Sequence, residues 1–252
     1  MLRSNCSPPE VRHAFWRRLR HGCDDALARG HAFVLILGHS GHLADPDLLS
    51  AAEYRRMACL RRQADRDNLA LGRTMIQQLA VPAGIPVPAP LLTGAQGKPY
   101  IAGAHPFNLA HSGHYVACAV CATHPIGIDI ELFDRAAPDP ALVALIAHPN
   151  ERRQIDALTG PRRARLFQQC WTRKEALLKQ QGLGLTETLP AIDVRLTSPC
   201  PLVQGEHGAR LYDLDLPAPD LRGALALDSA VHRVSLLFYD AAGVETAYLI
   251  PA

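Results

Sequence analysis

Two acidic residues on one face of an otherwise apolar segment limit the folds open to this chain more than any other feature. In GIDIE, residues 127–131, Asp129 and Glu131 are two positions apart, so on a β-strand both side chains point to the same side. Unpaired carboxylates are costly to bury, and a closed face therefore requires a metal or a cationic side chain beside them. An edge strand with its acidic face in water is the alternative interpretation.

A second segment, WTRKEALLK at residues 171–179, supplies matching groups. On a helix Glu175 and Lys179 are four residues apart and share a face. Three carboxylates and a lysine can therefore converge on one point. Oxygen ligands of this kind suit Mg²⁺, and Mg²⁺ with a lysine suits a diphosphate, which indicates phosphate chemistry. The alternative is a weak Glu–Lys pair on an exposed helix face. Lys174 points away from this face and is expected at the surface.

The composition is that of an ordinary soluble globular protein. Of the 252 residues 48% are hydrophobic and 20% are charged, and a net charge of +2 requires neither nucleic acid nor an anionic membrane as partner. No stretch approaches the roughly 20 apolar residues of a membrane span, and the first 30 residues lack the apolar centre of a secretory signal. The seven cysteines show no disulfide-framework spacing. We therefore expect a cytoplasmic protein.

Cys118 and Cys121 form a CxxC, which is compatible with redox or zinc chemistry. The surrounding run YVACAVCA alternates like a strand, on which residues three apart face opposite sides. No second pair stands at zinc-finger spacing, so buried strand cysteines are the preferred interpretation. A group of neighbouring histidines also matches no metal-ligand spacing. They are His105, His111, His114 and His124.

Hydrophobic periodicity predicts a mixture of helices and strands, which is an α+β fold. Residues 1–30 form a polar lead that is compatible with a helix, and residues 32–38 predict a buried strand. Residues 48–80 predict a helix, either continuous or broken near Asn68. Ser50 and Glu53, three residues later, are expected to form a capping box at its start.

A proline-rich loop at 81–99 leads into a region of strands and one long helix. The strands are predicted at 107–113, 115–122 and 126–132, with the last two paired around residues 123–125. The helix that contains Trp171 is expected to stop at Gly182 and Gly184. Alternating apolar runs predict four further strands, at 191–196, 209–216, 223–228 and 231–240.

Several cations are candidates for holding phosphate. Arg56 and Arg61 lie at the border between the apolar and polar faces of the 48–80 helix, and Arg56 is the better candidate because it can reach into a cleft. The helix's other arginines are expected on a solvated face opposite the core. These are Arg55, Arg62, Arg66 and Arg73.

A turn after the strand at 107–113 is a second candidate anion site. His111 is followed by Ser112 and Gly113, whose backbone N–H groups can hold an anion beside the imidazole. Lys98 lies in GKP, residues 97–99, on a constrained turn.

The blocks GKP, FNLAHSG, GIDIE and WTRKEALLKQQGLGL follow one another in an order that resembles the 4′-phosphopantetheinyl transferase family, in particular its larger, monomeric, surfactin-synthetase-activating type. The resemblance covers about residues 48–185. It implies an α+β fold of two similar halves related by a pseudo-twofold axis, each a small antiparallel sheet with a packed helix, and an active site between them. On this chain the halves are expected at 31–125 and 126–252, after the lead at 1–30.

The resemblance also implies a reaction. The 4′-phosphopantetheine arm of coenzyme A is transferred to a serine of an apo acyl or peptidyl carrier protein, in a Mg²⁺-dependent step that releases adenosine 3′,5′-bisphosphate. Such enzymes serve fatty acid, polyketide and nonribosomal peptide biosynthesis. The resemblance assigns Asp129, Glu131 and Glu175 to the metal and Lys179 to the phosphates of coenzyme A. Glu175, or a water it orients, is then the base for the serine.

The same resemblance assigns Arg56, Lys98, His111 and Ser112 to the nucleotide. It also shows a departure, because Ala110 stands where the family usually has serine, and the missing hydroxyl is expected to cost about 1 kcal/mol of binding. Two other functions stay open: a weak relative that binds coenzyme A or a carrier protein without turnover, and a metal-dependent nucleotide phosphodiesterase. Three arginines are candidates for carrier binding. They are Arg162, Arg163 and Arg165.

Overall fold

The computed structural model describes residues 8–38, 41–133, 136–184, 189–203, 208–240 and 242–251. The helices are α1 Pro9–Ala28, α2 Ala51–Cys59, α3 Gln63–Leu79, α4 Pro140–Ile146, α5 Pro149–Asp156 and α6 Gly160–Gln181. The strands are β1 Ala32–Gly38, β2 Leu92–Thr93, β3 Pro99–Tyr100, β4 Phe107–Ser112, β5 Tyr115–Val120, β6 Ile126–Leu132, β7 Leu202–Val203, β8 Ala209–Leu214, β9 Leu221–Asp228, β10 Arg233–Tyr239 and β11 Glu245–Pro251.

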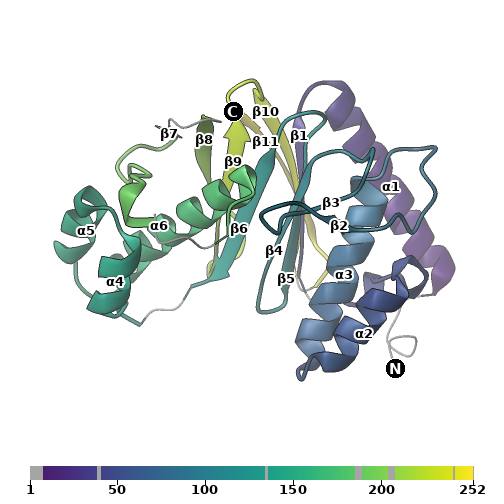
Figure 1. The fold of residues 1–252 in the computed structure, drawn as a ribbon, viewed down its shortest axis with the longest axis horizontal. Coiled ribbons are helices and arrows are strands. Elements are labelled where there is room, and N and C mark those ends of the chain that lie inside the picture. Colours follow the sequence, from purple (N-terminus) through teal and green to yellow (C-terminus); the bar gives the residue numbers. More distant parts are fainter. Residues whose placement is uncertain are drawn as a thin grey trace.

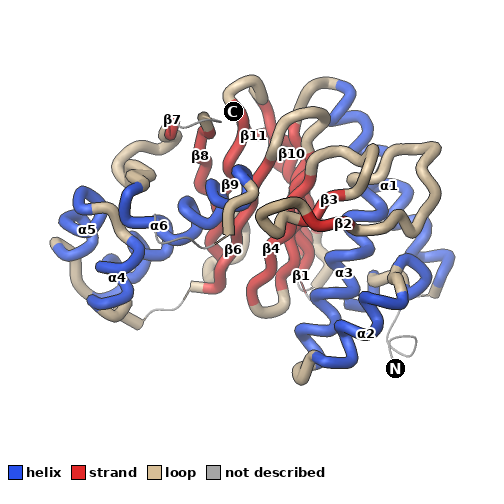
Figure 2. Tube along the Cα trace, in the orientation of Figure 1, coloured by secondary structure: helices blue, strands red, loops and turns tan. Residues whose placement is uncertain are grey.

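Two sheets lie next to each other in the centre of the molecule, and the long helices cover their outer faces (Figures 1 and 2). The first sheet has the order β11-β10-β1-β5-β4 and the second the order β6-β9-β8-β7, while β2 and β3 form a small hairpin. Apart from the parallel pair of β1 with β10, the strand pairs are antiparallel. The predicted α+β fold is thus confirmed.

Apolar cores between these layers hold them together. α1 and α3 pack on the first sheet, for example through Trp16 and Leu71. The two sheets pack on each other, where Ile36 of β1 and Ile128 of β6 are fully buried. α6 packs on the second sheet through Leu177 and its neighbours. Burial of this apolar surface is the main force that fixes the position of α6 over β6.

The strand cysteines divide between two of these cores, as the alternation predicted. Cys118 belongs to the core under α1 and α3, and Cys121 belongs to the core between the sheets. Both are buried free thiols. Burial raises the pKa of the Cys118 thiol well above its ordinary value, so it stays protonated and unreactive at neutral pH.

Both ends of the chain contribute to the first sheet and its core. The lead at 1–30 forms α1 over Pro9–Ala28, and Trp16, Leu19 and Cys23 of this helix are buried in the first core. β10 and β11 fall in the C-terminal half by sequence, yet they extend the first sheet, because β10 pairs with β1. The side-by-side pairing expected for 115–122 and 126–132 is wrong. β5 pairs with β1 and β4, and β6 pairs with β9, so the turn between them crosses from one sheet to the other.

The predicted helix at 48–80 is two helices. The capping box at its start is confirmed, because the Ser50 hydroxyl accepts a hydrogen bond from the Glu53 amide at 3.3 Å and the Glu53 carboxylate accepts one from the Ser50 amide at 2.8 Å. The break lies between α2 and α3, earlier than Asn68, which is inside α3. At the break the guanidinium of Arg66 donates to the Leu60 carbonyl and satisfies a free helix end.

The segment at 191–196 was predicted as a strand and is irregular after a short 3₁₀ turn at Leu189–Ala191. Side chains, rather than a neighbouring strand, satisfy its backbone. The Arg173 guanidinium donates to the carbonyls of Val194 and Arg195, and the Val194 amide donates to Glu151 at 2.6 Å. None of the described helices combines the length and apolar character needed to cross a membrane.

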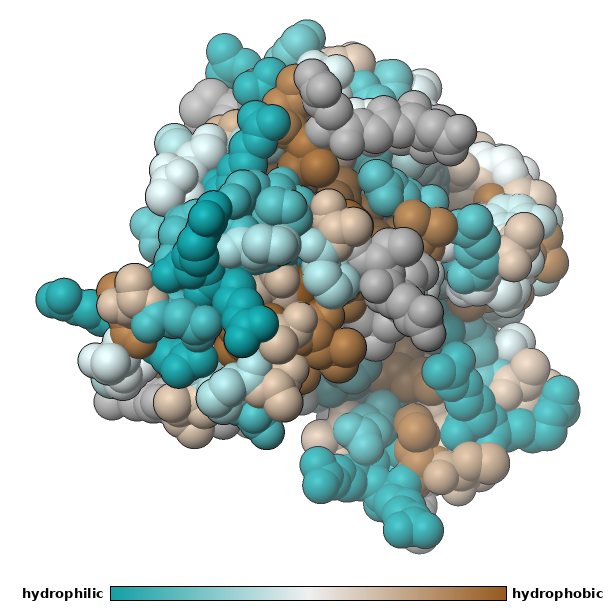
Figure 3. Space-filling view, turned by 60° about the vertical axis from the view of Figure 1, so that its left-hand side comes forward, coloured by the Kyte–Doolittle hydropathy of each residue, from teal (hydrophilic) through white to brown (hydrophobic). Residues whose placement is uncertain are grey.

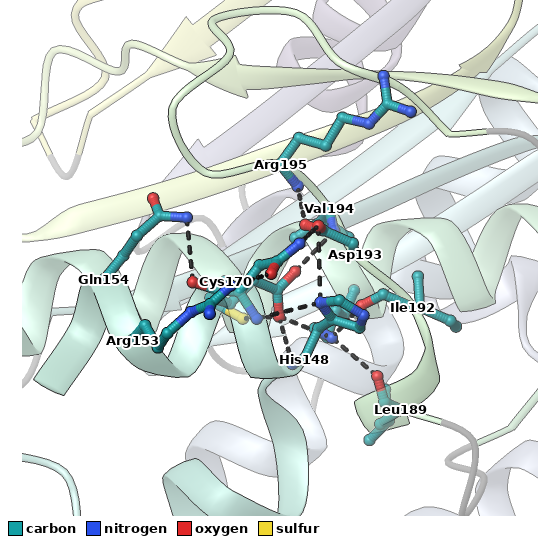
Figure 4. Close-up of polar contacts among 12 residues, drawn as sticks. His148, Arg153, Gln154, Cys170, Leu189, Ile192, Asp193, Val194 and Arg195 are labelled. Carbon is teal, nitrogen blue, oxygen red and sulfur yellow. Dashed lines mark hydrogen bonds and ion pairs between the residues drawn. The ribbon is translucent and has the colours of Figure 1, made fainter.

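A buried ion pair ties α5, α6 and this irregular segment together (Figure 4). Lys174 of α6, expected at the surface, is completely buried, and its ammonium lies 2.9 Å from the equally buried carboxylate of Glu151. The same ammonium donates to the carbonyls of Leu189 and Ile192, and Glu151 also accepts the His148 amide at 2.7 Å. The prediction failed because the charge of Lys174 is neutralised by groups that are distant in the sequence.

Candidate active site

Close contact between β6 and α6 builds the site. Gly127 makes this contact possible, because a β-carbon added there would lie 2.0 Å from the Ala176 carbonyl oxygen and 2.4 Å from the Gln180 amide nitrogen of α6. The alternation of β6 then directs Ile128 into the core between the sheets and leaves Asp129 under the helix.

Asp129, Glu175 and Lys179 meet between β6 and α6, as the sequence predicted. Asp129 is 4% exposed, and its Oδ1 atom accepts a hydrogen bond from Lys179 Nζ at 2.6 Å. Glu175 Oε2 lies 3.9 Å from the same ammonium. Oδ2 of Asp129 and Oε1 of Glu175 are buried and have no hydrogen-bond partner among the described residues. The cluster therefore contains two acceptor oxygens that are available to a ligand.

Glu131 lies at the edge of this cluster and is held by two other side chains. Its Oε2 atom accepts from the Ser112 hydroxyl at 2.8 Å, and its Oε1 atom accepts from Trp171 Nε1 at 3.3 Å. Ser112, predicted to hold the nucleotide, thus contacts Glu131. Trp171 was missed as a site residue, although it lies on the same helical stripe as Glu175.

Burial dominates the electrostatics of the carboxylates. It raises the pKa of Asp129 to about 7, against the opposing effect of the Lys179 ammonium, while Glu131 and Glu175 add to the increase. Burial likewise raises the pKa of Glu175. A second positive charge among these carboxylates would stabilise their ionised forms.

The donor set fits a divalent cation in part. Among the described residues no three histidine, cysteine or acidic side chains are grouped closely enough to enclose a metal ion. However, the two unpartnered oxygens of Asp129 and Glu175 are hard ligands, of the kind that Mg²⁺ prefers. The third predicted ligand, Glu131, has both oxygens engaged by Ser112 and Trp171. Asp129 and Glu175 are thus the residues best placed to hold such an ion.

A cavity of about 240 Å³ lies between α3 and β4, and His111 in its lining directly precedes Ser112, which contacts Glu131. Arg56 and His111, both predicted to hold the nucleotide, line it together with the buried Ala110.

Arg73 also lines the cavity, although the sequence predicted a solvated position, and its guanidinium lies 2.6 Å from Glu53 of α2. Arg73 was missed because the break lets α2 contact α3, which brings Glu53 to its guanidinium. Asp65 also lines the cavity, so the groups that it offers an anion are Arg56, which no described carboxylate pairs, and His111.

Lys98 lies away from both the cavity and the carboxylates. Its ammonium donates to the carbonyls of Ile126 at 3.0 Å and Gln180 at 3.2 Å, at the start of β6 and the end of α6. It therefore joins the β2–β3 hairpin to the second sheet and its helix. Burial lowers the pKa of Lys98 to about 8 from its ordinary 10.5.

Comparison with known proteins places the chain in a family. The model of the 4′-phosphopantetheinyl transferase superfamily matches residues 125–216, which include β6 and α6. The 4′-phosphopantetheinyl transferase of Bacillus subtilis is 32% identical over 158 residues, which are 60% of this chain and 69% of that protein. The chain belongs to the 4′-phosphopantetheinyl transferase family.

Other relatives are matched over a smaller share of their length. A Synechocystis sp. protein that carries the same transferase name is 32% identical over 159 residues, or 60% of this chain and 62% of that protein. The 4′-phosphopantetheinyl transferase AcpT of Escherichia coli K12 is 35% identical over 94 residues, or 36% of this chain and 48% of that protein. The chain thus spans less than two thirds of these two transferases.

The region matched by the superfamily model contains only part of the candidate site. The matched region 125–216 includes the three carboxylates of the cluster and its lysine: Asp129, Glu131, Glu175 and Lys179. The matched region thus includes the carboxylate cluster, whereas the residues that line the cavity precede it.

The lowered pKa of Lys98 gives a pH prediction. In the folded protein Lys98 loses its proton near pH 8, whereas in the unfolded chain it does so near 10.5, so the unfolded state binds more protons between these values. The contribution of Lys98 to the free energy of unfolding therefore rises with pH across this window. The K98M variant lacks this contribution.

Urea unfolding of the wild type and of K98M at about pH 7 and about pH 10 measures the effect. We expect the wild type to gain stability relative to the variant at the higher pH. If the free energies of unfolding of wild type and K98M differed by the same amount at both pH values, Lys98 would have its ordinary pKa in the folded state.

Proposed function

We propose that this chain transfers the 4′-phosphopantetheine arm of coenzyme A to a serine of an apo carrier protein. The observation that carries the proposal is the cluster of Asp129, Glu175 and Lys179 between β6 and α6, with an arginine-lined cavity beside it. A diphosphate ester needs both features, because its charge requires cations and its nucleotide end requires a separate anion site.

Each group has a role in this reaction. Arg56, Arg73 and His111 hold the phosphorylated ribose of coenzyme A in the cavity. Lys179 neutralises the diphosphate, which competes with Asp129 for its ammonium. Asp129 and Glu175 would hold Mg²⁺, because each has a buried oxygen without a hydrogen-bond partner among the described residues. The bound ion would supply positive charge that stabilises the diphosphate oxygens as the bond breaks.

Glu175 is the proposed base. Its Oε1 atom is the one assigned to the metal, so the proton is taken by Oε2, which lies 3.9 Å from the Lys179 ammonium, and burial raises the pKa of the carboxyl, which makes it a better proton acceptor. The serine oxygen forms a bond to the β-phosphorus, and the bond between this phosphorus and the bridging oxygen breaks. The serine proton passes to Glu175, and adenosine 3′,5′-bisphosphate leaves with the bridging oxygen.

Intact-mass spectrometry of an apo carrier protein incubated with this protein, coenzyme A and Mg²⁺ tests the proposal. The expected result is a gain of about 340 Da, the mass of the arm on serine, that disappears with EDTA. Coenzyme A binding without a mass gain on any of several carriers would favour a protein that binds coenzyme A without turnover. The absence of a hydroxyl at Ala110, a buried residue of the cavity, is consistent with that function. Release of the arm in the absence of a carrier would identify a phosphodiesterase.

A further inference from the structure

The two sheets meet along β4 and β6, where no backbone ladder joins them. β4 ends the first sheet and β6 ends the second, and the two strands lie side by side (Figure 1). Among the described residues no strand pair includes both of them. The backbone amides and carbonyls along an edge strand need other partners where the strand is buried. The edge of β6 that does not pair with β9 therefore depends on side chains.

Two side chains of β4 supply such partners at a regular spacing. Oδ1 of Asn108 accepts a hydrogen bond from the Ile128 amide at 2.8 Å, and the Ser112 hydroxyl accepts one from the Leu132 amide at 2.9 Å. Each bond joins residues that are 20 positions apart, so the two strands run in the same direction. Ala110, between them on the same face of β4, has no polar side-chain atom. The bonds of Asn108 and Ser112 thus take the place of a ladder.

The two faces of β4 serve different parts of the candidate site. Leu109 and His111 alternate with Asn108 along the strand and line the cavity beside α3. On the other face Asn108 holds Ile128, the residue directly before Asp129. β4 therefore links the groups proposed for the nucleotide to the strand that carries a carboxylate proposed for the metal.

The bond between Asn108 and Ile128 is buried in apolar surroundings. In Figure 3 hydrophilic side chains cover much of the outer surface, whereas the core between the sheets, to which Ile128 belongs, is apolar. Asn108 is 6% exposed and Ile128 is fully buried. A backbone amide in such a place is costly to leave unpaired, so its bond to Asn108 resists a shift of β6 relative to β4.

We infer that Asn108 is a positioning residue for the proposed transfer: by holding the Ile128 amide, it sets Asp129 at the distance from the cavity that coenzyme A requires. The inference rests on the proposed function, in which the metal end and the nucleotide end of one substrate bind to different sheets. The two ends cooperate only if β4 and β6 keep their relative position, because small displacements weaken groups that must act together.

Three variants separate positioning from stability. Asn108→Leu has a similar size but no acceptor, whereas Asn108→Asp keeps an acceptor oxygen in the same place whether its carboxyl is ionised or neutral. The matched control is Gln77→Leu in α3, which removes an equally buried amide that bonds to both the amide and the carbonyl of Ala89, away from β6. Urea unfolding should show that both leucine variants fold with reduced stability. Asn108→Ala takes the place of Asn108→Leu if leucine prevents folding.

Calorimetry measures the affinity for coenzyme A with and without Mg²⁺, and no turnover is required. In wild type, Asn108→Asp and Gln77→Leu we expect Mg²⁺ to increase this affinity about tenfold or more, and in Asn108→Leu less than about threefold. The affinity for adenosine 3′-monophosphate, which needs only the groups of the cavity, should be the same in all four proteins.

Each other outcome has a definite meaning. The inference is overturned if Mg²⁺ acts equally on wild type and Asn108→Leu, or does not act on wild type. It also fails if Gln77→Leu shows the same loss as Asn108→Leu, or if Asn108→Asp does not restore the effect. If the effect of Mg²⁺ depends on Asn108 but no carrier protein gains mass, the proposed function is wrong and the positioning role stands.

Discussion

Replacing Glu175 with glutamine is expected to slow transfer of the phosphopantetheine arm by about 10³-fold or more, while the protein still folds. Glutamine has nearly the same shape but carries no negative charge. The variant therefore loses a proposed metal ligand and the proposed proton acceptor together. The fold should survive, because Glu175 makes only a long contact of 3.9 Å to Lys179, and its Oε1 atom has no partner among the described residues.

Glu131→Gln is the matched control, because it makes the same chemical change two positions along β6 from Asp129, on the same face of the strand. The Glu131 oxygens are already engaged by Ser112 and Trp171, so we expect a smaller loss, about 10- to 100-fold. Initial rates from intact-mass spectrometry compare the two variants, and calorimetry measures whether coenzyme A still binds. A Glu175→Gln variant with the wild-type rate would remove Glu175 from the mechanism.

Replacing Glu151 with alanine is expected to lower the free energy of unfolding by about 3–5 kcal/mol. The substitution leaves the completely buried ammonium of Lys174 without its counter-ion. It also removes the acceptor for the amides of His148 and Val194, which lie in separate segments. Unpaired buried groups of this kind account for the largest effects of single substitutions.

Urea denaturation measures this loss of stability, and two further variants serve as comparisons. Asp156→Ala breaks the exposed pairs with Arg152 and Arg163, and it should cost less than about 1 kcal/mol. The double variant E151L/K174M replaces both buried charges with apolar groups and should recover part of the lost stability. If Glu151→Ala were as mild as Asp156→Ala, the buried pair would not be a main support of α6.

The sequence alone predicted the local geometry of the site. Alternation in GIDIE and the four-residue spacing in WTRKEALLK brought Asp129, Glu175 and Lys179 to one place, and the structure has them there. The capping box at Ser50 and the opposite orientations of the two strand cysteines were predicted in the same way. These features follow from helix and strand periods, which depend only on neighbouring residues.

Only the tertiary structure decided which distant groups meet. Lys174 and Arg73 look in sequence like solvated cations, yet Glu151 and Glu53 neutralise them from other helices. β10 belongs to the first sheet because it pairs with β1. Segment 191–196 is not a strand, and Arg173 accepts the role of a neighbouring strand by donating hydrogen bonds to its carbonyls. The period of a helix or strand fixes the direction in which a side chain points. Contacts between segments far apart in the chain decide which group it meets, and therefore what it contributes to stability and to the site.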